Sequence, residues 1–347
     1  MVRAAACMFE IVRVGLLAAA LLHSSGARAA ESHDGVLVKR TQMHMGTLVT
    51  ITAVAPTRKG ADGAIDAGFA EIRRLEQLLS TWITDSELSR VNANAGRAPV
   101  RVSPDTLSLL QRSVEIARMT EGAFNIAIGP ATEAWGFGKA ERIPTDAELL
   151  ALRPLTDLSQ LTLDASTRMV FLGRAGMRLD VGGIGKGFAA DRAADVMQRA
   201  GATGGVVALS GDIKAFGRMP DGKPFLLGIQ HPRQAGALLA RVALQDEAIS
   251  TAGDYERFFD RDGVRYHHIL DPRTLQPARG CQSVTVIARE GVMADGLDTG
   301  IFVMGADRGM DLIERLPDVE GVIVDANGRV LVSSGLKGRL QLLQSPP

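Results

Sequence analysis

The spacing of apolar residues along the chain predicts several amphipathic helices. Between residues 61 and 80, side chains such as Ile65 and Phe69 recur every three or four positions, which is the period of one helical face. Residues 104–120 repeat this spacing, and Ser103-Pro104 has the residue types preferred at an N-cap and a first helical position. Further helices are predicted over residues 184–200, 294–304 and 308–316.

Runs rich in β-branched residues predict strands between and after these helices. Residues 36–43 and 47–53 form two such runs around the turn-prone Met45-Gly46, which predicts an opening hairpin. Later runs cover residues 205–209, 225–229, 239–244, 283–288, 321–325 and 330–333. These strands follow one another without strict alternation with helices, which favours an α+β fold over a doubly wound parallel sheet.

The domain organisation predicted from these patterns is simple. Residues 136–163, rich in Pro, Asp and Lys, form the weakest boundary, and we do not divide the chain there. We expect one domain over residues 31–347, with mixed or antiparallel sheets flanked by helices.

Residues 1–30 predict a signal peptide. Arg3 and Arg13 lead into the uncharged run 14–22, which is too short to span a bilayer. Small residues then offer a cleavage site near Ala29 or Ala30. We therefore expect an exported protein, and the signal type fits a periplasm; an uncleaved N-terminal anchor is the alternative.

The charges of the chain are balanced. Lysine plus arginine equals aspartate plus glutamate, at 39 each, and no block of like charge occurs. Nothing therefore indicates binding to nucleic acid. Because Cys7 lies in the predicted signal, Cys281 would be the one cysteine of the mature chain, which excludes an internal disulfide.

A glycine-dense segment over residues 180–191 is a candidate phosphate-binding loop. Glycine lets backbone amides at a helix N-terminus approach an anion closely. The segment is not a Walker A loop, because glycine follows Lys186 where Ser or Thr would be needed. The pattern Gly-x-Gly-x-x-Ala that begins at Gly185, with Asp212 as the acidic residue, also fits a dinucleotide fingerprint. A Rossmann-type NAD(P) oxidoreductase is therefore an alternative, and a tight turn packed on a sheet is the purely structural interpretation.

Asp295, Asp298 and Thr299 are spaced to lie on one face at the start of a helix. As N-cap and N3 residue, Asp295 and Asp298 would stabilise that helix through its amides and its dipole. The same oxygens could instead hold magnesium, which typically takes one or two carboxylates together with substrate phosphate. The phosphate-binding loop elsewhere in the chain favours the metal site.

His267 and His268 alternate along a strand that enters the turn at Asp271-Pro272. Successive strand residues point to opposite faces, so one histidine can face a pocket while the other does not. No further Cys or His pair stands at ligand spacing, which argues against zinc.

Taken together, these segments resemble the ApbE family, the FAD:protein FMN transferases, from about Met43 to Gly335. The matching motifs follow one another along the chain: Met45-Gly-Thr47, Ser80-Thr-Trp82 with residues 85–92, residues 122–130 with 135–138, residues 179–187, Ser210-Gly-Asp212-Ile213, residues 268–272 and residues 294–299.

The resemblance implies that FAD is the substrate and Mg²⁺ the cofactor. FMN would pass to a Thr or Ser hydroxyl of another exported or membrane-bound protein, such as a membrane-associated redox flavoprotein, and AMP would be released. It implies metal ligation by the Gly183 carbonyl, Asp295, Asp298 and Thr299, and it makes His268 the candidate base. The FAD-binding positions it implies are Met45, Trp82, Ala123, Phe124, Asn125, Asp180, Lys186 and Leu270. A protein that binds or hydrolyses FAD without an acceptor remains the alternative.

Three positions depart from the residues common in the family. Asn125 stands where Asp is frequent, Gly182-Gly183 where Thr-Ala or Ser-Ala is common, and Trp82 where Tyr often occurs. Asn still forms hydrogen bonds, a carbonyl ligand tolerates glycine, and either aromatic can stack on a flat ring. We expect flavin binding to survive all three.

Overall fold

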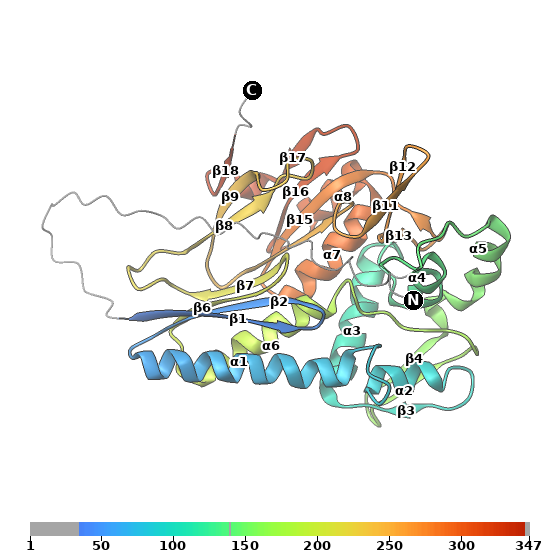
Figure 1. Ribbon diagram of the computed structural model, residues 1–347, viewed down its shortest axis with the longest axis horizontal. Helices are drawn as coiled ribbons and strands as arrows, with labels where there is room; N and C mark the ends of the chain where they lie inside the picture. Colours follow the sequence, from blue (N-terminus) through green and yellow to red (C-terminus); the bar gives the residue numbers. More distant parts are fainter. Residues whose placement is uncertain (1–34, 139, 344–347) are drawn as a thin grey trace, which may run out of the picture.

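The centre of the protein is an eight-stranded sheet, described here from a computed structural model that covers residues 35–138 and 140–343. Its strand order is β1-β2-β6-β7-β10-β15-β16-β17, and each pairing in it is antiparallel (Figure 1). The strands are β1 (Val36–His44), β2 (Thr47–Ala55), β6 (Gly204–Leu209), β7 (Asp212–Gly217), β10 (Ala248–Gly253), β15 (Cys281–Ala288), β16 (Val319–Asp325) and β17 (Val330–Val332).

The predicted opening hairpin is confirmed. Strands β1 and β2 pair in register from Val36 opposite Ala55 to His44 opposite Thr47. The two turn residues, Met45 and Gly46, have φ values of 50° and 72°, as a tight two-residue hairpin turn requires. The amide of Met45 donates to the carboxylate of Glu76 on the following helix at 2.7 Å, which fixes the turn against that helix.

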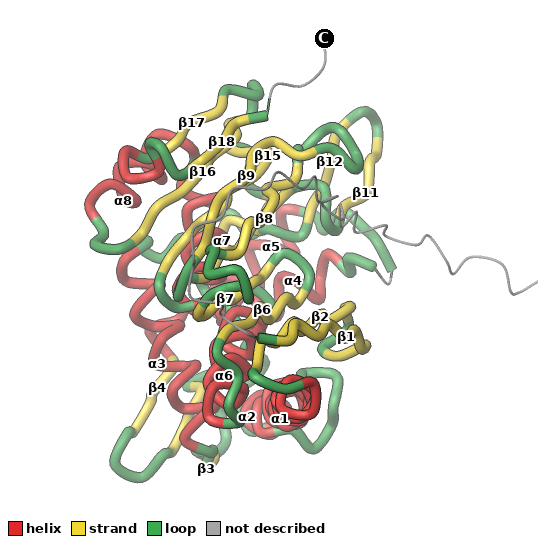
Figure 2. The backbone as a smooth tube through the Cα atoms, turned by 90° about the vertical axis from the view of Figure 1, so that its left-hand side faces the viewer, coloured by secondary structure: helices red, strands yellow, loops and turns green. Residues whose placement is uncertain are grey.

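Helices cover one face of the sheet (Figures 1 and 2). Their apolar sides share one core with alternate sheet residues such as Ile51, Val284 and Val286. Ser103 caps α3 and Pro104 is its first residue, as predicted. The helices are α1 (Arg58–Leu79), α2 (Glu87–Ala93), α3 (Pro104–Met119), α6 (Gly185–Arg199), α7 (Gly291–Met304) and α8 (Ala306–Arg315).

A three-stranded sheet packs on the other face and forms a second core. Its strands, in the order β18-β9-β8, contribute Ile229 and Val242, which meet Ile249 and Ile287 of the large sheet. They are β8 (Phe225–Gln230), β9 (Leu238–Leu244) and β18 (Leu340–Leu342).

The remaining elements surround the two cores. A third, smaller core gathers around Trp135, where residues 136–163 contribute Leu149 and pack against Leu270. The elements are α4 (Gly129–Trp135), α5 (Asp146–Leu152), β3 (Val100–Arg101), β4 (Leu161–Asp164), β5 (Met169–Leu172), β11 (Phe258–Arg261), β12 (Val264–His267), β13 (Leu270–Asp271), β14 (Gln276–Pro277), and the 3₁₀ turns η1 (Ile126–Ile128), η2 (Arg153–Leu155), η3 (Leu158–Gln160) and η4 (Ser334–Leu336).

This architecture confirms the α+β class. Throughout the described residues every strand pairing is antiparallel, which contradicts the Rossmann alternative, because that fold needs a parallel sheet. The predicted signal peptide, residues 1–30, lies outside the described residues. Within 35–138 and 140–343, no helix has both the length and the apolar character needed to cross a bilayer.

Candidate active site

The glycine-rich segment forms a loop that leads into α6. Asn92 holds its start, because the side-chain amide bonds both the N–H and the carbonyl of Leu179, at 2.7 and 3.0 Å. The amide of Asp180 donates to the carbonyl of Ile126 at 2.7 Å, and its carboxylate accepts from Gly182 at 2.8 Å. The loop that was predicted to bind phosphate is therefore held by residues that precede it by more than 50 positions in the chain, Asn92 and Ile126.

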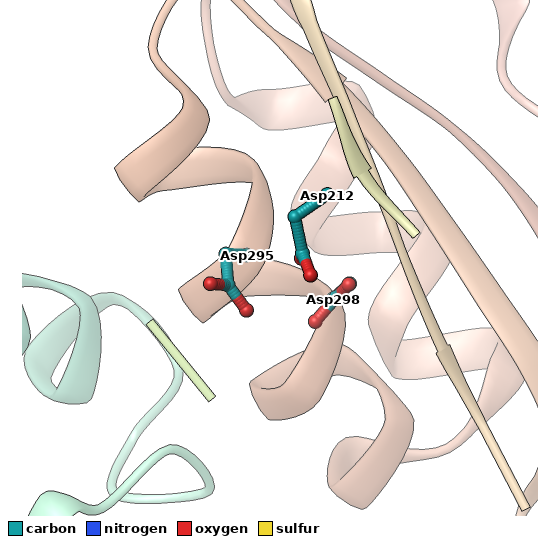
Figure 3. A group of neighbouring side chains, drawn as sticks. All are labelled: Asp212, Asp295 and Asp298. Carbon is teal, nitrogen blue, oxygen red and sulfur yellow. The ribbon is translucent and has the colours of Figure 1, made fainter. Parts of the chain in front are cut away.

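Three buried aspartates meet beside this loop and form the carboxylate cluster, which we define as Asp212, Asp295 and Asp298. Asp212 is the first residue of β7, and Asp295 and Asp298 lie on α7. The three side chains point toward one another (Figure 3). One oxygen from each lies within 4.8 Å of the others, and each residue is at most 3% exposed. Lys186, on the first turn of α6, places its ammonium against Asp212.

The electrostatics of the carboxylate cluster are strained by burial. Desolvation, followed by the charge of Asp212, raises the pKa of Asp295 to about 8, and desolvation with the charge of Asp295 raises that of Asp298 well above its usual value. Burial alone would lower the pKa of Lys186, but the cluster outweighs it and raises that pKa. Among residues 35–138 and 140–343, one lysine faces these three carboxylates, so this part of the chain gives the cluster an excess of negative charge.

Ser250 on β10 shows the same excess. Its hydroxyl oxygen lies 2.5 Å from Asp212 Oδ1 and 2.6 Å from Asp298 Oδ2. A hydroxyl has one proton and can donate to only one carboxylate at a time. The second short contact therefore needs a proton on a carboxyl group, or a cation that replaces it.

Thr299 and Gly183 complete the set of oxygens. The Thr299 hydroxyl donates to Asp298 Oδ1 at 3.1 Å, and a methyl group added at Gly183 would lie 3.0 Å from the same hydroxyl oxygen. The four residues predicted to hold metal therefore lie together with Asp212, which sequence reasoning placed elsewhere. Carboxylate, hydroxyl and carbonyl oxygens are the ligands that Mg²⁺ prefers, so this donor set fits that ion.

The predicted roles of Asp295 as N-cap and Asp298 as N3 residue of their own helix are both wrong. Helix α7 begins at Gly291, so Asp295 lies in its second turn and cannot be its N-cap. Instead Asp295 Oδ2 accepts from the amide of Gly187 at 2.8 Å and caps the neighbouring helix α6, whose own N-cap residue Ile184 provides no side-chain bond.

The two histidines occupy different surroundings. His267 is buried, and its Nε2 lies 2.7 Å from the carbonyl oxygen of Ala278, while its ring meets Phe302 edge to face. His268 is half-buried, and its Nδ1 lies 3.3 Å from the carbonyl of Arg257. Desolvation, followed by the charge of Arg257, lowers the His268 pKa to about 3, so the ring is neutral at pH 7. Because a carbonyl only accepts, Nδ1 carries the proton and Nε2 keeps a free lone pair.

The predicted flavin-binding residues lie on several elements. Met45 is in the first hairpin turn and Trp82, 76% exposed, follows α1. Asn125 donates to the carbonyl of Thr156 at 2.8 Å and accepts from Ala127 at 2.7 Å. An aspartate could not make the first of these bonds, which gives Asn125 a structural reason in this chain. The others are Ala123 and Phe124, which are buried, Asp180 and Lys186 in and after the loop, and Leu270, which belongs to the third core.

A cavity of about 610 Å³ lies between α5 and the β13–β14 hairpin, and its lining includes none of the carboxylate cluster. The chemistry of the carboxylate cluster identifies the candidate active site.

Sequence reasoning missed two members of the site. Asp212 was considered as the acidic residue of a dinucleotide fingerprint and as part of a family motif, but not as a member of the metal-ligand set, and the structure places it in the carboxylate cluster. Ser250 lies on a strand that was not predicted at all. Little in the sequence indicates this strand, because Ser250 and Thr251 are polar and interrupt the apolar run expected of a buried strand.

Comparison with known proteins identifies the family of this chain. A family model described as the ApbE family matches residues 45–323. The FAD:protein FMN transferase of Vibrio cholerae is 36% identical over 275 residues, which cover 76% of this chain and 82% of that protein. The FAD:protein FMN transferase of Treponema pallidum is 34% identical over 354 residues, 96% of each protein.

Solved structures give the same result. The crystal structure of the ApbE protein from Thermotoga maritima superposes with a TM-score of 0.81 at 30% identity, covering 88% of this chain and 99% of that one. The matching family model, the relatives and the fold agree over most of the chain, which makes it a member of the ApbE family and a flavin transferase enzyme.

Proposed function

We propose that this enzyme moves the FMN moiety of FAD onto a Thr or Ser hydroxyl of an acceptor protein, in a magnesium-dependent reaction that releases AMP. The observation that carries the proposal is the buried carboxylate cluster with Lys186 against it, next to a loop whose backbone can approach phosphate. Protons or a cation can relieve the cluster's excess of negative charge, and a pyrophosphate substrate, which brings more negative charge to the same place, favours the cation.

The proposed metal ligands are the oxygens that lie together here. Asp295, Asp298 and Thr299 would hold Mg²⁺ with the Gly183 carbonyl, and Asp212 adds a carboxylate that the sequence did not suggest. When bound, the ion would supply charge neutralisation to the pyrophosphate. Lys186, at the same cluster, would bind phosphate oxygens as a second positive charge.

The proposed transfer forms one bond to phosphorus and breaks another. The acceptor oxygen forms a bond to the phosphorus of FMN, and the bond from that phosphorus to the bridging oxygen of FAD breaks. AMP leaves with the bridging oxygen, and the proton of the acceptor hydroxyl passes to a base. No oxidant or reductant is needed.

His268 is the proposed base. Its Nε2 keeps a lone pair because Nδ1 is held by the carbonyl of Arg257. The low pKa means that the ring is uncharged at neutral pH, with Nε2 unprotonated, and nearby phosphate charge would raise its proton affinity.

The acceptor and location are also proposals. The basic and apolar pattern of residues 1–30 supports export, which would place the enzyme with exported or membrane-bound flavoproteins. An acceptor with an exposed Thr or Ser in a flavinylation motif is the partner that this chemistry requires.

The decisive experiment incubates the protein with FAD, Mg²⁺ and an exported acceptor domain that carries a Thr or Ser flavinylation motif. We expect the acceptor to gain the mass of FMN, AMP to appear in equal amount, and both to stop with a chelator. AMP without a mass gain would favour a FAD-hydrolysing protein, and no AMP would overturn the proposal.

The role of His268 has its own test. His268→Gln should lower the rate of transfer about 100-fold, because general-base catalysis contributes on that order, while the dissociation constant for FAD stays near wild type. His231→Gln is the matched control, since His231 serves a loop in which its Nδ1 accepts from the Arg233 amide. Equal losses in FAD binding and in rate would assign His268 to binding instead.

A further inference from the structure

Helices α6 and α7 touch through two glycines at their N-terminal ends. A methyl group at Gly291 would lie 2.6 Å from the carbonyl oxygen of Gly187, and one at Gly187 would collide with the carbonyl of Gly291. Added at Gly187, it would also lie 2.7 Å from Cβ of Asp295. The two backbones are therefore in direct contact, and no other residue fits at either position.

Each helix caps the other across this contact. Asp191, on α6, accepts from the amides of Gly291 and Val292 at 2.7 and 2.9 Å. Asp295, on α7, accepts from the amide of Gly187 at 2.8 Å. Neither helix has a side-chain bond from its own N-cap residue, so the first-turn amides depend on the partner helix for these bonds.

Lys214 ties Asp191 to the strand that carries part of the site. Its ammonium donates to the carbonyl of Arg289, just before α7, and lies 4.0 Å from Asp191. Lys214 and Asp212 are two residues apart on β7, so they share a face of that strand. One strand thus contributes Asp212 to the carboxylate cluster and a counter-charge to Asp191.

We propose that Asp191 is a positioning residue which, through this exchange of caps, sets the place of Asp295 and Asp298 relative to Lys186 and the glycine loop. The inference rests on the proposed metal-dependent transfer. Asp191 touches neither Asp295 nor Asp298, but it fixes the first turn of the helix that presents them. Asp295 cannot shift toward or away from a metal without also releasing the amide of Gly187.

The test measures Mg²⁺ binding directly, by calorimetry without FAD, in Asp191→Asn. An amide side chain accepts through one oxygen only and turns an N–H group toward a backbone N–H, so one cap bond is lost. We expect roughly ten-fold weaker Mg²⁺ binding, as for other residues that orient metal ligands. Asp195→Asn is the matched control, because it removes the same charge from the same helix at a half-exposed side chain that faces Arg192.

Amide hydrogen exchange separates positioning from a local structural role. In Asp191→Asn, the Gly187 amide should lose protection together with Gly291 and Val292, although Gly187 bonds Asp295 and not Asp191. Protection lost only at Gly291 and Val292, with Mg²⁺ affinity unchanged, would overturn the inference. If Asp191→Asn does not fold, Asp191→Glu keeps the charge but displaces α7, and wild-type Mg²⁺ affinity in that variant would also overturn it.

Mg²⁺ binding by wild type and by Asp195→Asn separates failure of this inference from failure of the proposed function. If wild type and Asp195→Asn bind no Mg²⁺, the metal-dependent reaction itself is wrong. If both bind Mg²⁺ and Asp191→Asn binds equally well, only the role of Asp191 is wrong.

Discussion

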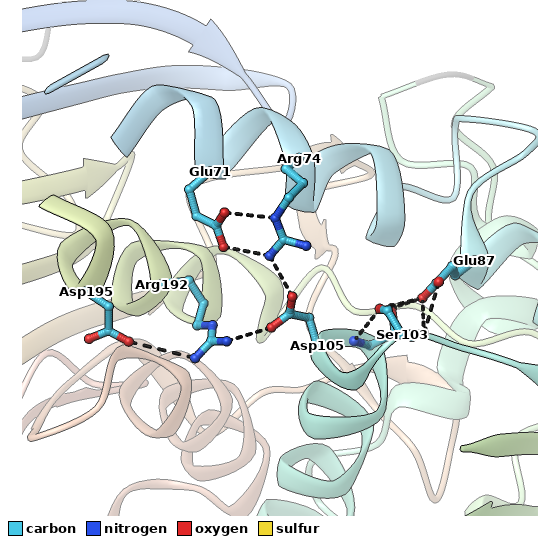
Figure 4. Close-up of polar contacts among 8 residues, drawn as sticks. Glu71, Arg74, Glu87, Ser103, Asp105, Arg192 and Asp195 are labelled. Atoms are coloured by element: carbon cyan, nitrogen blue, oxygen red, sulfur yellow. Dashed lines mark hydrogen bonds and ion pairs between the residues drawn. The ribbon is translucent and has the colours of Figure 1, made fainter. Parts of the chain in front are cut away.

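Two groups of charged side chains in this protein differ in how their carboxylates are paired with positive charges. In the helix network, which comprises Glu71, Arg74, Asp105, Arg192 and Asp195, guanidinium groups separate the acids (Figure 4). Asp105 accepts from Arg74 at 2.6 Å and from Arg192 at 2.8 Å, and so joins α3 to α1 and α6. In the carboxylate cluster, by contrast, three acids lie together, and Lys186 is the one lysine that the described part of the chain places against them.

The pKa values of the acids record this difference. Burial alone would raise the pKa of Asp105, but Arg74 and Arg192 overcome it and lower that pKa. In the cluster, burial and neighbouring acids raise the pKa of Asp295 and Asp298. A network with matched charges holds helices together, whereas an unmatched buried cluster is held in place by the rest of the fold and is available for a cation.

The largest expected effect is on catalysis. Asp298→Asn removes a proposed metal ligand and should lower FAD-dependent transfer at least about 100-fold. The same change relieves repulsion among the cluster carboxylates, so the unfolding temperature in a chelator should stay equal to wild type or rise. Asp298 is a sharper choice than Asp295, which also caps α6. Wild-type turnover in Asp298→Asn would contradict a metal site at the cluster. A large loss of stability would show that the cluster, like the helix network, holds the fold together.

An intermediate effect is expected from pH. The pKa of Asp295 is about 8 in the fold against 3.8 for the free side chain, so the folded protein binds more protons between these values. Metal-free stability should therefore fall as the pH rises from about 5 to about 8, and Mg²⁺ affinity should rise at least about ten-fold over that range, because the ion competes with protons.

Thermal unfolding across this range, with a chelator and with Mg²⁺, checks the sign. In Asp298→Asn the metal-free slope should be flatter, which isolates the cluster from other titrating groups. Asp105 contributes to stability with the opposite dependence on pH. Its pKa is lower in the folded protein than in the unfolded chain, so it stabilises the fold above the pKa of the unfolded chain, and this stabilisation is lost as the pH falls. Metal-free stability that rises toward about pH 8 in wild type, and equally in Asp298→Asn, would contradict the prediction.

The smallest effect is expected in the helix network. Asp105→Ala should lower the free energy of unfolding by about 1 kcal/mol, because its two arginine partners are nearly half exposed and screened by solvent. Denaturant unfolding measures this, with Asp195→Asn as a control that should change little. Turnover should remain at the wild-type level, and a loss of transferase activity in Asp105→Ala would show that the two groups are coupled.

Much of the fold could be predicted because its signals are local. The helical spacing of Ile65 and Phe69, the Ser103-Pro104 cap and the Met45-Gly46 turn depend only on neighbours in the chain, and all three are confirmed. The α+β class followed from the order of such segments.

The start of α7 and the full site could not be predicted, because they depend on distant residues. The segment before Ala294 contains no capping side chain of its own, and its cap comes from Asp191, 100 residues earlier than Gly291. Strand β10 is buried, but Ser250 and Thr251 make it look polar, since Ser250 serves the carboxylate cluster. The pairing of Asp212 with Asp295 exists only once β7 and α7 are packed together.

The exchange of caps between α6 and α7 rests on an approximate symmetry of sequence, although Asp191 accepts from two amides and Asp295 from one. On each helix a glycine is followed four residues later by an aspartate, as Gly187 and Asp191 on one and Gly291 and Asp295 on the other. The symmetry ends at Asp298, which has only Ala194 at the matching place on α6. The residue three positions after the aspartate therefore decides which helix adds a further carboxylate to the cluster: Asp298 does so on α7, and Ala194 has none to offer on α6.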